Sequence, residues 1–209
     1  MNFNKKIKQI QSQKLHPVIF VSGLGGSGKT TFAKKLVAET PNAKLLELDW
    51  YLIHNSKERA ERIKNVLGPA NKNQHLIDKE LDPINWYDWE SFKKDLERFQ
   101  KEGKFFVKNA WNQTTGEKDS EHSLDFEGNN GLIVCEGIFM LHPAIRLLAD
   151  FSILVDLPKV EARKRAEERD KNARSKEHLE RKKIIMEKYD VPYFEKYKGN
   201  ADLILNGSN

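Results

Sequence analysis

The sequence predicts an α/β protein of three layers, in which helices cover both faces of a mainly parallel five-stranded sheet. Continuous apolar runs rich in β-branched residues alternate with segments of helical spacing, a pattern typical of strands buried on both faces. A glycine-rich loop stands between the first apolar run and the first helical segment, which covers 31–39. The strands are expected at residues 17–22, 44–49, 131–137, 151–156 and 202–206.

Residues 23–30 match the phosphate-binding loop pattern of Gly, four residues, Gly, Lys and Ser or Thr. Backbone N–H groups of such a loop converge on a polyphosphate, and the positive end of the following helix faces the anion. A flexible strand-to-helix turn is the alternative, which the Lys and Thr in their places disfavour. Lys29 is expected on the β and γ phosphates and Thr30 on Mg²⁺. The expected nucleotide-binding residues of this loop are Gly23, Gly25, Gly26, Ser27, Gly28, Lys29, Thr30 and Thr31.

The composition limits the class of protein. The 209 residues suffice for one α/β domain with a sizeable core, so a single domain is expected over 1–209. Lys and Arg number 36 against 31 acidic residues, and this interspersed charge of +5 does not indicate a nucleic-acid partner. A single cysteine, no secretory segment and no long apolar run favour a cytoplasmic protein with no membrane partner. The six histidines lack metal-ligand spacing, and homo-oligomerisation stays open.

The remaining elements follow from periodicity and from residues that end helices. An amphipathic helix is expected within 1–14, a charged helix over 55–67 and a polar loop over 71–79. A further helix opens within 81–89, and Gly103 ends it. Residues 104–107 and 123–126 alternate weakly and can pair as a hairpin, so 104–127 is interpreted as an insertion on the substrate side.

Acidic residues end two of the predicted strands, Asp49 in the second and Glu136 in the third. Because ligands bind outside the carboxyl ends of parallel strands, Asp49 is expected beside the phosphate loop. An acid there is also a common turn starter or helix N-cap, which stays open as an alternative. Asp82 precedes a helix in a loop that could face the same site. Trp111 is a loop tryptophan, for which stacking on a substrate and covering the core are even alternatives.

The stretch 158–181 is dense in cations, and most of it is interpreted as a solvated helix face with glutamates at pairing distance. Arg165 and Arg169 stand four residues apart on one face, and Arg174 follows an expected helix break. In a chain that binds polyphosphate, these three arginines are expected to form a lid that closes over ATP.

Together these residues resemble the uridine kinase and phosphoribulokinase family of P-loop small-molecule kinases, over nearly the whole chain from 18 to 205. Besides the loop, Asp49-Trp50-Tyr51 is similar to the family's Asp-x-Phe-Tyr, and Leu81-Asp82-Pro83 resembles its Phe-Asp-His-Pro segment. The strand end Glu136-Gly137-Ile138, the lid arginines and the segments 191–197 and 201–205 are similar as well.

The resemblance implies a P-loop fold with a helical lid, ATP and Mg²⁺ as cofactors, and a small-molecule acceptor. It implies that Asp49 is the base near the acceptor hydroxyl and that Thr30, Asp49 and Glu136 surround Mg²⁺. Asp82 would hold sugar hydroxyls, and Trp111 stands where the family has a tyrosine against the base. The segment 111–118 lacks the family's His and Arg that read the pyrimidine, and Ala166 replaces the usual second lid arginine.

The sequence therefore favours an ATP-dependent kinase of a small hydroxylated metabolite, most of all a nucleoside. Lys29, Mg²⁺ and the lid arginines, with Arg169 as a catalytic group, would neutralise the transferred phosphoryl group. Tyr51, Asp82 and Trp111 suit a flat ring that carries vicinal hydroxyls, since aromatic rings stack and a carboxylate accepts from a sugar.

Other functions stay open. Pantothenate or a sugar phosphate is the alternative acceptor, and a linear acid would want a cation near the acceptor pocket. In another class, a P-loop switch or a regulator without catalysis remains. For the switch, residues 125–128 spell Asp-x-x-Gly, although no strong strand precedes them.

Overall fold

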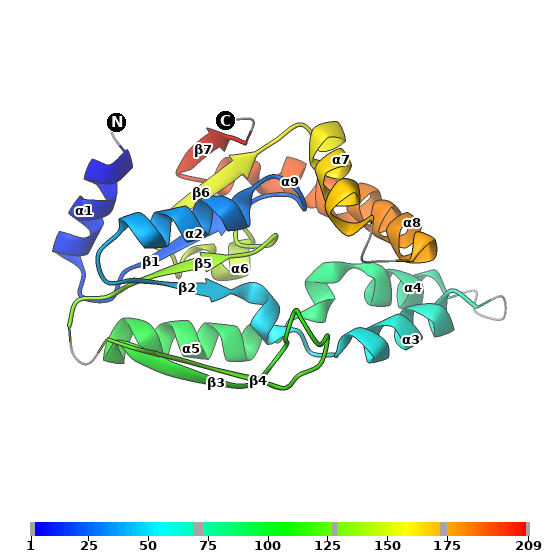
Figure 1. Cartoon of the computed structure of the whole chain (residues 1–209), viewed down its shortest axis with the longest axis horizontal. Helices are drawn as coiled ribbons and strands as arrows, with labels where there is room; N and C mark the ends of the chain where they lie inside the picture. Colours follow the sequence, from blue (N-terminus) through cyan, green and yellow to red (C-terminus); the bar gives the residue numbers. More distant parts are fainter. Residues whose placement is uncertain (1–2, 69–72, 127–128, 172–174, 208–209) are drawn as a thin grey trace.

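A computed structural model describes residues 3–68, 73–126, 129–171 and 175–207 and has an α/β architecture (Figure 1). Its central sheet has five strands in the order β2-β5-β1-β6-β7, with every neighbouring pair parallel. The strands are β1 (Val18–Ser22), β2 (Ala43–Glu47), β5 (Leu132–Glu136), β6 (Phe151–Asp156) and β7 (Leu203–Asn206). The predicted fold class is confirmed, and the strands lie where the apolar runs predict them.

Helices cover both faces of the sheet, because successive residues of each buried strand point to opposite faces. In β1, Ile19 and Val21 belong to the core under α1 (Phe3–Gln13) and α2 (Lys29–Glu39). The neighbouring Phe20 belongs to the opposite core, under α5 (Trp89–Glu102). In Figure 1, α2 lies above β2 and α5 lies below it.

The predicted hairpin is present, as β3 (Lys104–Ala110) and β4 (Ser120–Asp125) pair antiparallel outside the main sheet. It packs beside α5, whose C-terminal end is Gly103 with φ +70°, a left-handed conformation that favours glycine. The hairpin and α5 share a core of aromatic and aliphatic side chains, formed by Phe92, Leu96, Phe99, Phe105, Val107, Leu124 and Phe126.

The polar loop predicted over 71–79 is wrong in its described part, since α4 spans Gln74–Leu81. The Asn73 side chain caps this helix by accepting from a backbone N–H of its first turn. The helix is short and mostly polar, so its periodicity is weak. Packing against α3 (Ser56–Val66) and α8 (Lys176–Ile185) supplies its stability. The small core that these helices share consists of Ile63, Ile77, Leu81, Trp86, Ile185 and Tyr189.

Several helices gather where the strands finish (Figure 1). They are the pair α3 and α4, and α7 (Lys159–Asp170) with α8 (Lys176–Ile185). A π-helical turn, η3 (Met186–Asp190), connects α8 directly to α9 (Val191–Tyr197). The short elements η1 (Leu48–Tyr51), η2 (Pro83–Trp86), α6 (Pro143–Arg146) and η4 (Lys198–Asn200) complete the described chain. This end of the sheet is the one where parallel α/β proteins bind their ligands.

None of the helices in the described ranges has both the length and the apolar character that crossing a membrane requires.

Candidate active site

The glycine-rich loop joins β1 to α2 and lies against α7. Gly28 has φ +92° and immediately precedes α2, in the left-handed region that favours glycine. Gly26 has φ +88°, and a Cβ added there would stand 2.1 Å from the Ala162 carbonyl oxygen of α7. Only glycine therefore allows the loop to approach α7 this closely. A Cβ at Gly25 would meet nothing within 4 Å, so a ligand can reach the backbone at that point.

The first turn of α2 brings Lys29 and Thr30 to Glu136 at the end of β5. The Thr30 hydroxyl donates to Glu136 Oε2 over 3.1 Å, and Lys29 Nζ lies 4.0 Å from the same oxygen. The Lys29 and Glu136 side chains are only 14% and 10% exposed, so these charges interact with little screening by solvent. Ser27 Oγ, in the same loop, is buried without a hydrogen-bond partner among the described residues. Thr31 is exposed on the next position of the helix.

Negative charge gathers where β2 and β5 end. Glu47 pairs with Glu136 in the strand register, and Asp49 follows two residues later. Burial raises the pKa of Glu136, Lys29 lowers it, and the charges of Asp49 and Glu47 raise it. Burial also raises the pKa of Glu47, and Asp49 adds to the shift while Lys34 and Lys29 oppose it. A bound cation would relieve the repulsion between these carboxylates.

The donor set fits Mg²⁺ that arrives with a nucleotide. Within the described ranges, no three His, Cys, Asp or Glu side chains converge closely enough to hold a metal ion by themselves. Mg²⁺ is usually bound by one or two carboxylates together with phosphate oxygens, and it keeps several waters. Thr30, Asp49 and Glu136 therefore stay the predicted metal-site residues, with the nucleotide supplying the remaining oxygens.

Asp49 lies in η1, directly after β2, and is exposed at the carboxyl end of the sheet. The Tyr87 hydroxyl donates to Asp49 Oδ1 over 3.0 Å and so orients the carboxylate. Burial raises the pKa of Tyr87, and the nearby Asp49 charge raises it further, so the phenol keeps its proton at neutral pH. With one oxygen held by Tyr87, the other can accept a proton from a substrate hydroxyl.

We expect Tyr87→Phe to lower kcat about tenfold, because the lost hydrogen bond to a charged group is worth roughly 1.5 kcal/mol. The ring packs beside Trp89 and Phe139, and phenylalanine keeps that packing, so the midpoint of thermal unfolding should change little. Steady-state ADP release at saturating ATP measures the effect. Tyr189→Phe is the matched control, since its hydroxyl donates to a carboxylate in α4. Equal rates for the two variants would contradict the role of Tyr87.

Two of the three predicted lid arginines are in the described chain, and Arg174 lies outside it. Arg165 donates to Glu161 and to the Gly207 carbonyl oxygen, each over 3.0 Å. Arg169 pairs with Asp170 over 2.8 Å.

Asp170 connects the two lid helices, since it also pairs with Lys182 of α8. Burial acts to raise the pKa of Asp170, but hydrogen bonds from Arg169 and Lys182 lower it to about 2. The two described lid arginines are thus paired with groups of the same chain, and phosphate oxygens would have to displace those groups.

The predicted acceptor residues lie in different surroundings. Asp82 caps η2 by accepting from the Ile84 N–H over 3.1 Å, and burial raises its pKa. Tyr51 is 4% exposed, and its hydroxyl donates to Asp95 of α5 over 2.8 Å. Trp111 is 9% exposed and belongs to the same core as Tyr51. Asp82 is the one acid among these three, and its charge acts to raise the pKa of Asp190. The roles of all three toward an acceptor stay predictions.

Sequence patterns did not indicate three further residues around Asp49. They are Arg59 of α3, Tyr87 and Asp190, the last residue of η3. Burial and the Asp49 charge raise the pKa of Tyr87, while Arg59 lowers it and Asp190 raises it, so all three charges act on this hydroxyl. None of them belongs to a motif, because elements distant in the sequence supply them.

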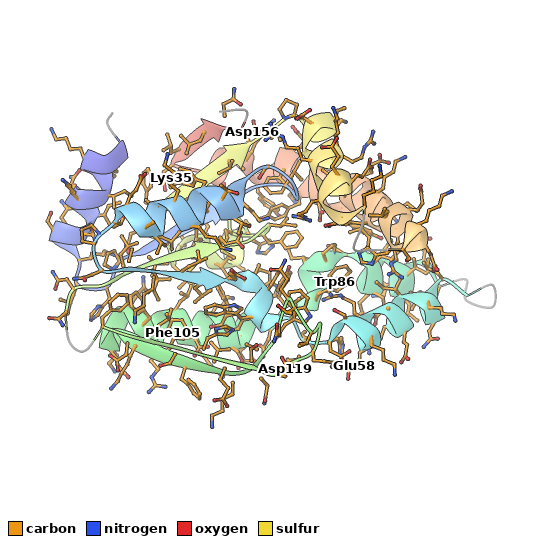
Figure 2. All side chains as sticks on the ribbon, in the orientation of Figure 1. Lys35, Glu58, Trp86, Phe105, Asp119 and Asp156 are labelled. Carbon is orange, nitrogen blue, oxygen red and sulfur yellow. The ribbon has the colours of Figure 1, made fainter. Side chains whose placement is uncertain are left out.

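A cation also stands on the acceptor side of the site. The Arg59 guanidinium carbon lies 5.0 Å from the ring centre of Trp86 and 6.0 Å from that of Trp111. Figure 2 shows Trp86 beside α4, at the end of the sheet where the strands finish. A guanidinium held over aromatic rings presents planar N–H donors to a carbonyl, carboxylate or phosphate oxygen.

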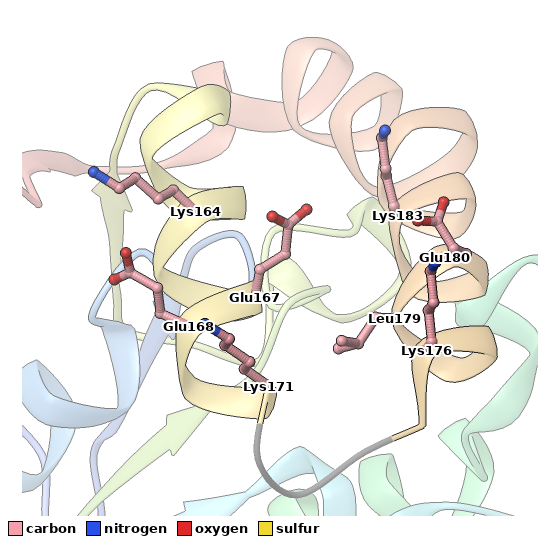
Figure 3. Close-up of a pocket in the computed structure, with 8 residues that line it drawn as sticks. All are labelled: Lys164, Glu167, Glu168, Lys171, Lys176, Leu179, Glu180 and Lys183. Atoms are coloured by element: carbon pink, nitrogen blue, oxygen red, sulfur yellow. The ribbon is translucent and has the colours of Figure 1, made fainter.

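A concavity of about 440 Å³ lies between α7 and α8 (Figure 3). Figure 3 shows Glu167 and Leu179 in the space between the two helices. Charges of both signs alternate along its walls, so they favour neither an anion nor a cation. This groove is the solvated helix face that the sequence predicts, lined by Lys164, Glu167, Glu168, Lys171, Lys176, Leu179, Glu180 and Lys183.

The chain is similar to known proteins over most of its length. The profile of the Phosphoribulokinase / Uridine kinase family matches residues 18–207. A uridine kinase of Ureaplasma parvum is 28% identical over 165 residues, 76% of this chain and 71% of the relative.

Two solved structures have a similar fold. A D-glycerate 3-kinase from Cryptococcus neoformans has a TM-score of 0.63 and 12% identity over 98% of this chain and 92% of its own. A phosphoribulokinase from Rhodobacter spheroides has a TM-score of 0.60 and 17% identity over 93% of this chain and 73% of its own. At these identities the two structures support the fold alone, whereas the family profile covers the loop, the strand ends and the lid helices. The chain therefore belongs to the phosphoribulokinase/uridine kinase family and is an ATP-binding P-loop kinase.

Proposed function

We propose that this kinase transfers the γ-phosphoryl group of ATP to a hydroxyl of a small metabolite, with Asp49 as the general base. The pair formed by Asp49 and Tyr87 carries the proposal, because it orients a carboxylate at the edge of the sheet where Lys29 and Glu136 meet. A base within reach of the acceptor hydroxyl takes its proton as the oxygen attacks phosphorus.

The other parts have the roles that phosphoryl transfer requires. Thr30, Asp49 and Glu136 would hold Mg²⁺, which neutralises charge on the β and γ phosphates. Lys29 and Arg169 would stabilise the charge that develops on the transferred group, and Arg165 would assist binding of ATP. Little covalent chemistry is left for the protein, so positioning and electrostatics account for most of the rate.

The proposed acceptor is a nucleoside or a closely similar compound. The Asp82 carboxylate can accept from sugar hydroxyls, and Arg59 can donate to a ring carbonyl beside the two tryptophans. The name of the Ureaplasma relative, a uridine kinase, supports this choice. Because the segment after Trp111 differs from the family pattern that reads pyrimidines, selectivity for the base should be loose or altered.

A hydroxy acid or sugar phosphate is the second candidate, and Arg59 is the observation that favours it. A linear acid needs a cation in the acceptor pocket, and the Arg59 guanidinium can bind a carboxylate or phosphate. The fold neighbour named as a D-glycerate 3-kinase is consistent with such an acceptor on this fold.

ADP release with uridine, cytidine, D-glycerate, pantothenate and a pentose phosphate in turn tests the proposal. We expect the nucleosides to raise ADP release well above the rate without acceptor, with ATP preferred over GTP. If an acid alone supports turnover, the second candidate replaces the first. A protein that binds nucleotide but gives no acceptor-dependent ADP release would be a regulator, and the proposed function would be wrong.

A further inference from the structure

Asp190 is a buried carboxylate that the chemistry described above does not use. It is 7% exposed, and its Oδ1 has no hydrogen-bond partner among the described residues. Burial raises its pKa to about 7, although Lys29 and Lys182 act to lower it and Asp82 acts to raise it further. An unpaired carboxylate in such a place costs folding free energy unless a ligand supplies a donor.

The carboxylate lines a pocket beside the phosphate loop. The pocket has a volume of about 50 Å³, more than the roughly 10–15 Å³ of cavity that one water molecule needs. Gly25, where the loop backbone is open, is part of the same wall. The pocket can therefore take a hydroxyl or an amino group of a molecule bound next to the loop. Most of the remaining wall comes from the lid helices α7 and α8, and it consists of Ile138, Arg163, Ala166, Glu167, Asp170, Leu179, Lys182, Lys183 and Met186.

The element that carries Asp190 is irregular. The π-helical turn η3 follows α8 and continues into α9 without a break, and Asp190 is its last residue. A π turn widens one turn of a helix at some cost in hydrogen bonding, and such turns occur frequently at functional sites. Met186 and Asp190, the two ends of this turn, both line the pocket.

Packing connects the pocket to the acceptor side of the site. Ile138 of the pocket wall is followed in the chain by Phe139, whose ring centre lies 6.0 Å from that of Tyr87, the residue that orients Asp49. The Asp190 charge also acts to raise the pKa of Tyr87, and the Asp82 charge acts to raise that of Asp190. A ligand group with an O–H or N–H would satisfy the unpaired Asp190 Oδ1.

We propose that Asp190 binds the acceptor, by accepting a hydrogen bond from a hydroxyl or amino group that the acceptor places in this pocket. The inference rests on the proposed function and refines its substrate class. With Asp82 and Asp190 both present, the part of the acceptor near these residues is uncharged and carries at least two donors, as a vicinal diol does. An acidic group would have to point away from them, toward Arg59.

Asp190→Asn tests the inference, since it removes the charge while keeping the size of the side chain. We expect the KM for the acceptor at pH 8 to rise about fivefold, because the asparagine oxygen still accepts a hydrogen bond but a neutral acceptor binds more weakly than a charged one, and the KM for ATP to stay within twofold. Glu195→Gln is the matched control, because this acid lies in the following helix α9 and pairs with Lys198 at the surface. Steady-state ADP release with the best acceptor of the panel measures both constants.

Thermal unfolding supplies a readout that does not depend on turnover. In the folded protein Asp190 keeps its proton up to about pH 7, whereas an unfolded chain loses it near pH 4. Wild-type stability therefore falls as the pH rises between these values. Asp190→Asn removes this loss, so it should be more stable than wild type at pH 8, with a smaller difference at pH 5.

The outcomes separate the inference from the proposed function. Higher acceptor KM together with higher stability would support a binding role, and Asp190→Ala should repeat the kinetic effect. Higher stability with an unchanged acceptor KM would mean that Asp190 only destabilises the fold, and this would overturn the inference. A change confined to the KM for ATP would overturn it as well. If wild type turns over no acceptor, the proposed function fails first. In that case the readout is the rise in Tm that millimolar uridine or D-glycerate causes in wild type and in Asp190→Asn. An equal rise in the two proteins overturns the inference.

Discussion

Asp49→Asn is expected to lower kcat by about a hundred- to ten-thousandfold, the range that general base catalysis contributes, while affinity for ATP changes little. Asparagine keeps the hydrogen bond from Tyr87, because its side-chain oxygen can accept as Oδ1 does. It cannot take a proton from the acceptor, and it is a weaker ligand for Mg²⁺. The effect should therefore fall on kcat, with a higher Mg²⁺ requirement as a secondary change.

The matched control for this variant is Asp156→Asn, which changes the acid that ends β6 in the same sheet. Asp156 lies apart from Trp86 and the acceptor side in Figure 2, and its replacement should leave kcat within about twofold. Initial rates of ADP release at saturating ATP and acceptor compare the two. If Asp49→Asn retains more than about a tenth of the wild-type kcat, another group must be the base.

Lys29→Ala is expected to reduce kcat by about a hundred- to a thousandfold, the usual effect of removing one donor that stabilises transition-state charge. The side chain is 14% exposed and belongs to none of the three core clusters of the described residues, so its loss creates no core cavity. Its removal leaves the buried Glu136 without its cation, and the pKa of that carboxyl should rise further. A carboxyl can take up a proton instead of unfolding the chain, so the fold should persist.

Lys35→Ala is the control for Lys29, because Lys35 is a lysine of the same helix with a 71% exposed side chain. Circular dichroism and the midpoint of thermal unfolding should show both variants folded. Near-normal turnover by a folded Lys29→Ala protein would remove this residue from the proposed phosphate site.

The replacement of a lid arginine by Ala166 has a packing explanation. Ala166 is 6% exposed, and its backbone nitrogen would stand 3.0 Å from a Cβ added at Gly26. At this contact α7 and the phosphate loop approach so closely that a small side chain fits. The helix thus covers one side of the loop through its backbone, and the phosphate contacts proposed for the lid fall to Arg165 and Arg169.

The sequence by itself determined the sheet, the loop and the acids at its edge. Buried parallel strands need continuous apolar runs, and a phosphate loop needs its glycines, lysine and threonine at fixed spacing. Local sequence patterns therefore specify both. Thr30 and Lys29 lie beside Glu136 because parallel strands end at one edge of the sheet. The short helix α4 escaped prediction because its periodicity is weak and tertiary packing stabilises it.

Only the tertiary structure decided which side chains surround Asp49 and which aromatic rings are covered. Tyr87, Arg59 and Asp190 come from three separate elements and carry no common spacing, so no local pattern could unite them. Tyr51 and Trp111 look alike in sequence as loop aromatics, yet both pack into the core. The physical reason is that burial and long-range contact depend on how distant elements pack, whereas strand, helix and loop formation depend largely on neighbouring residues.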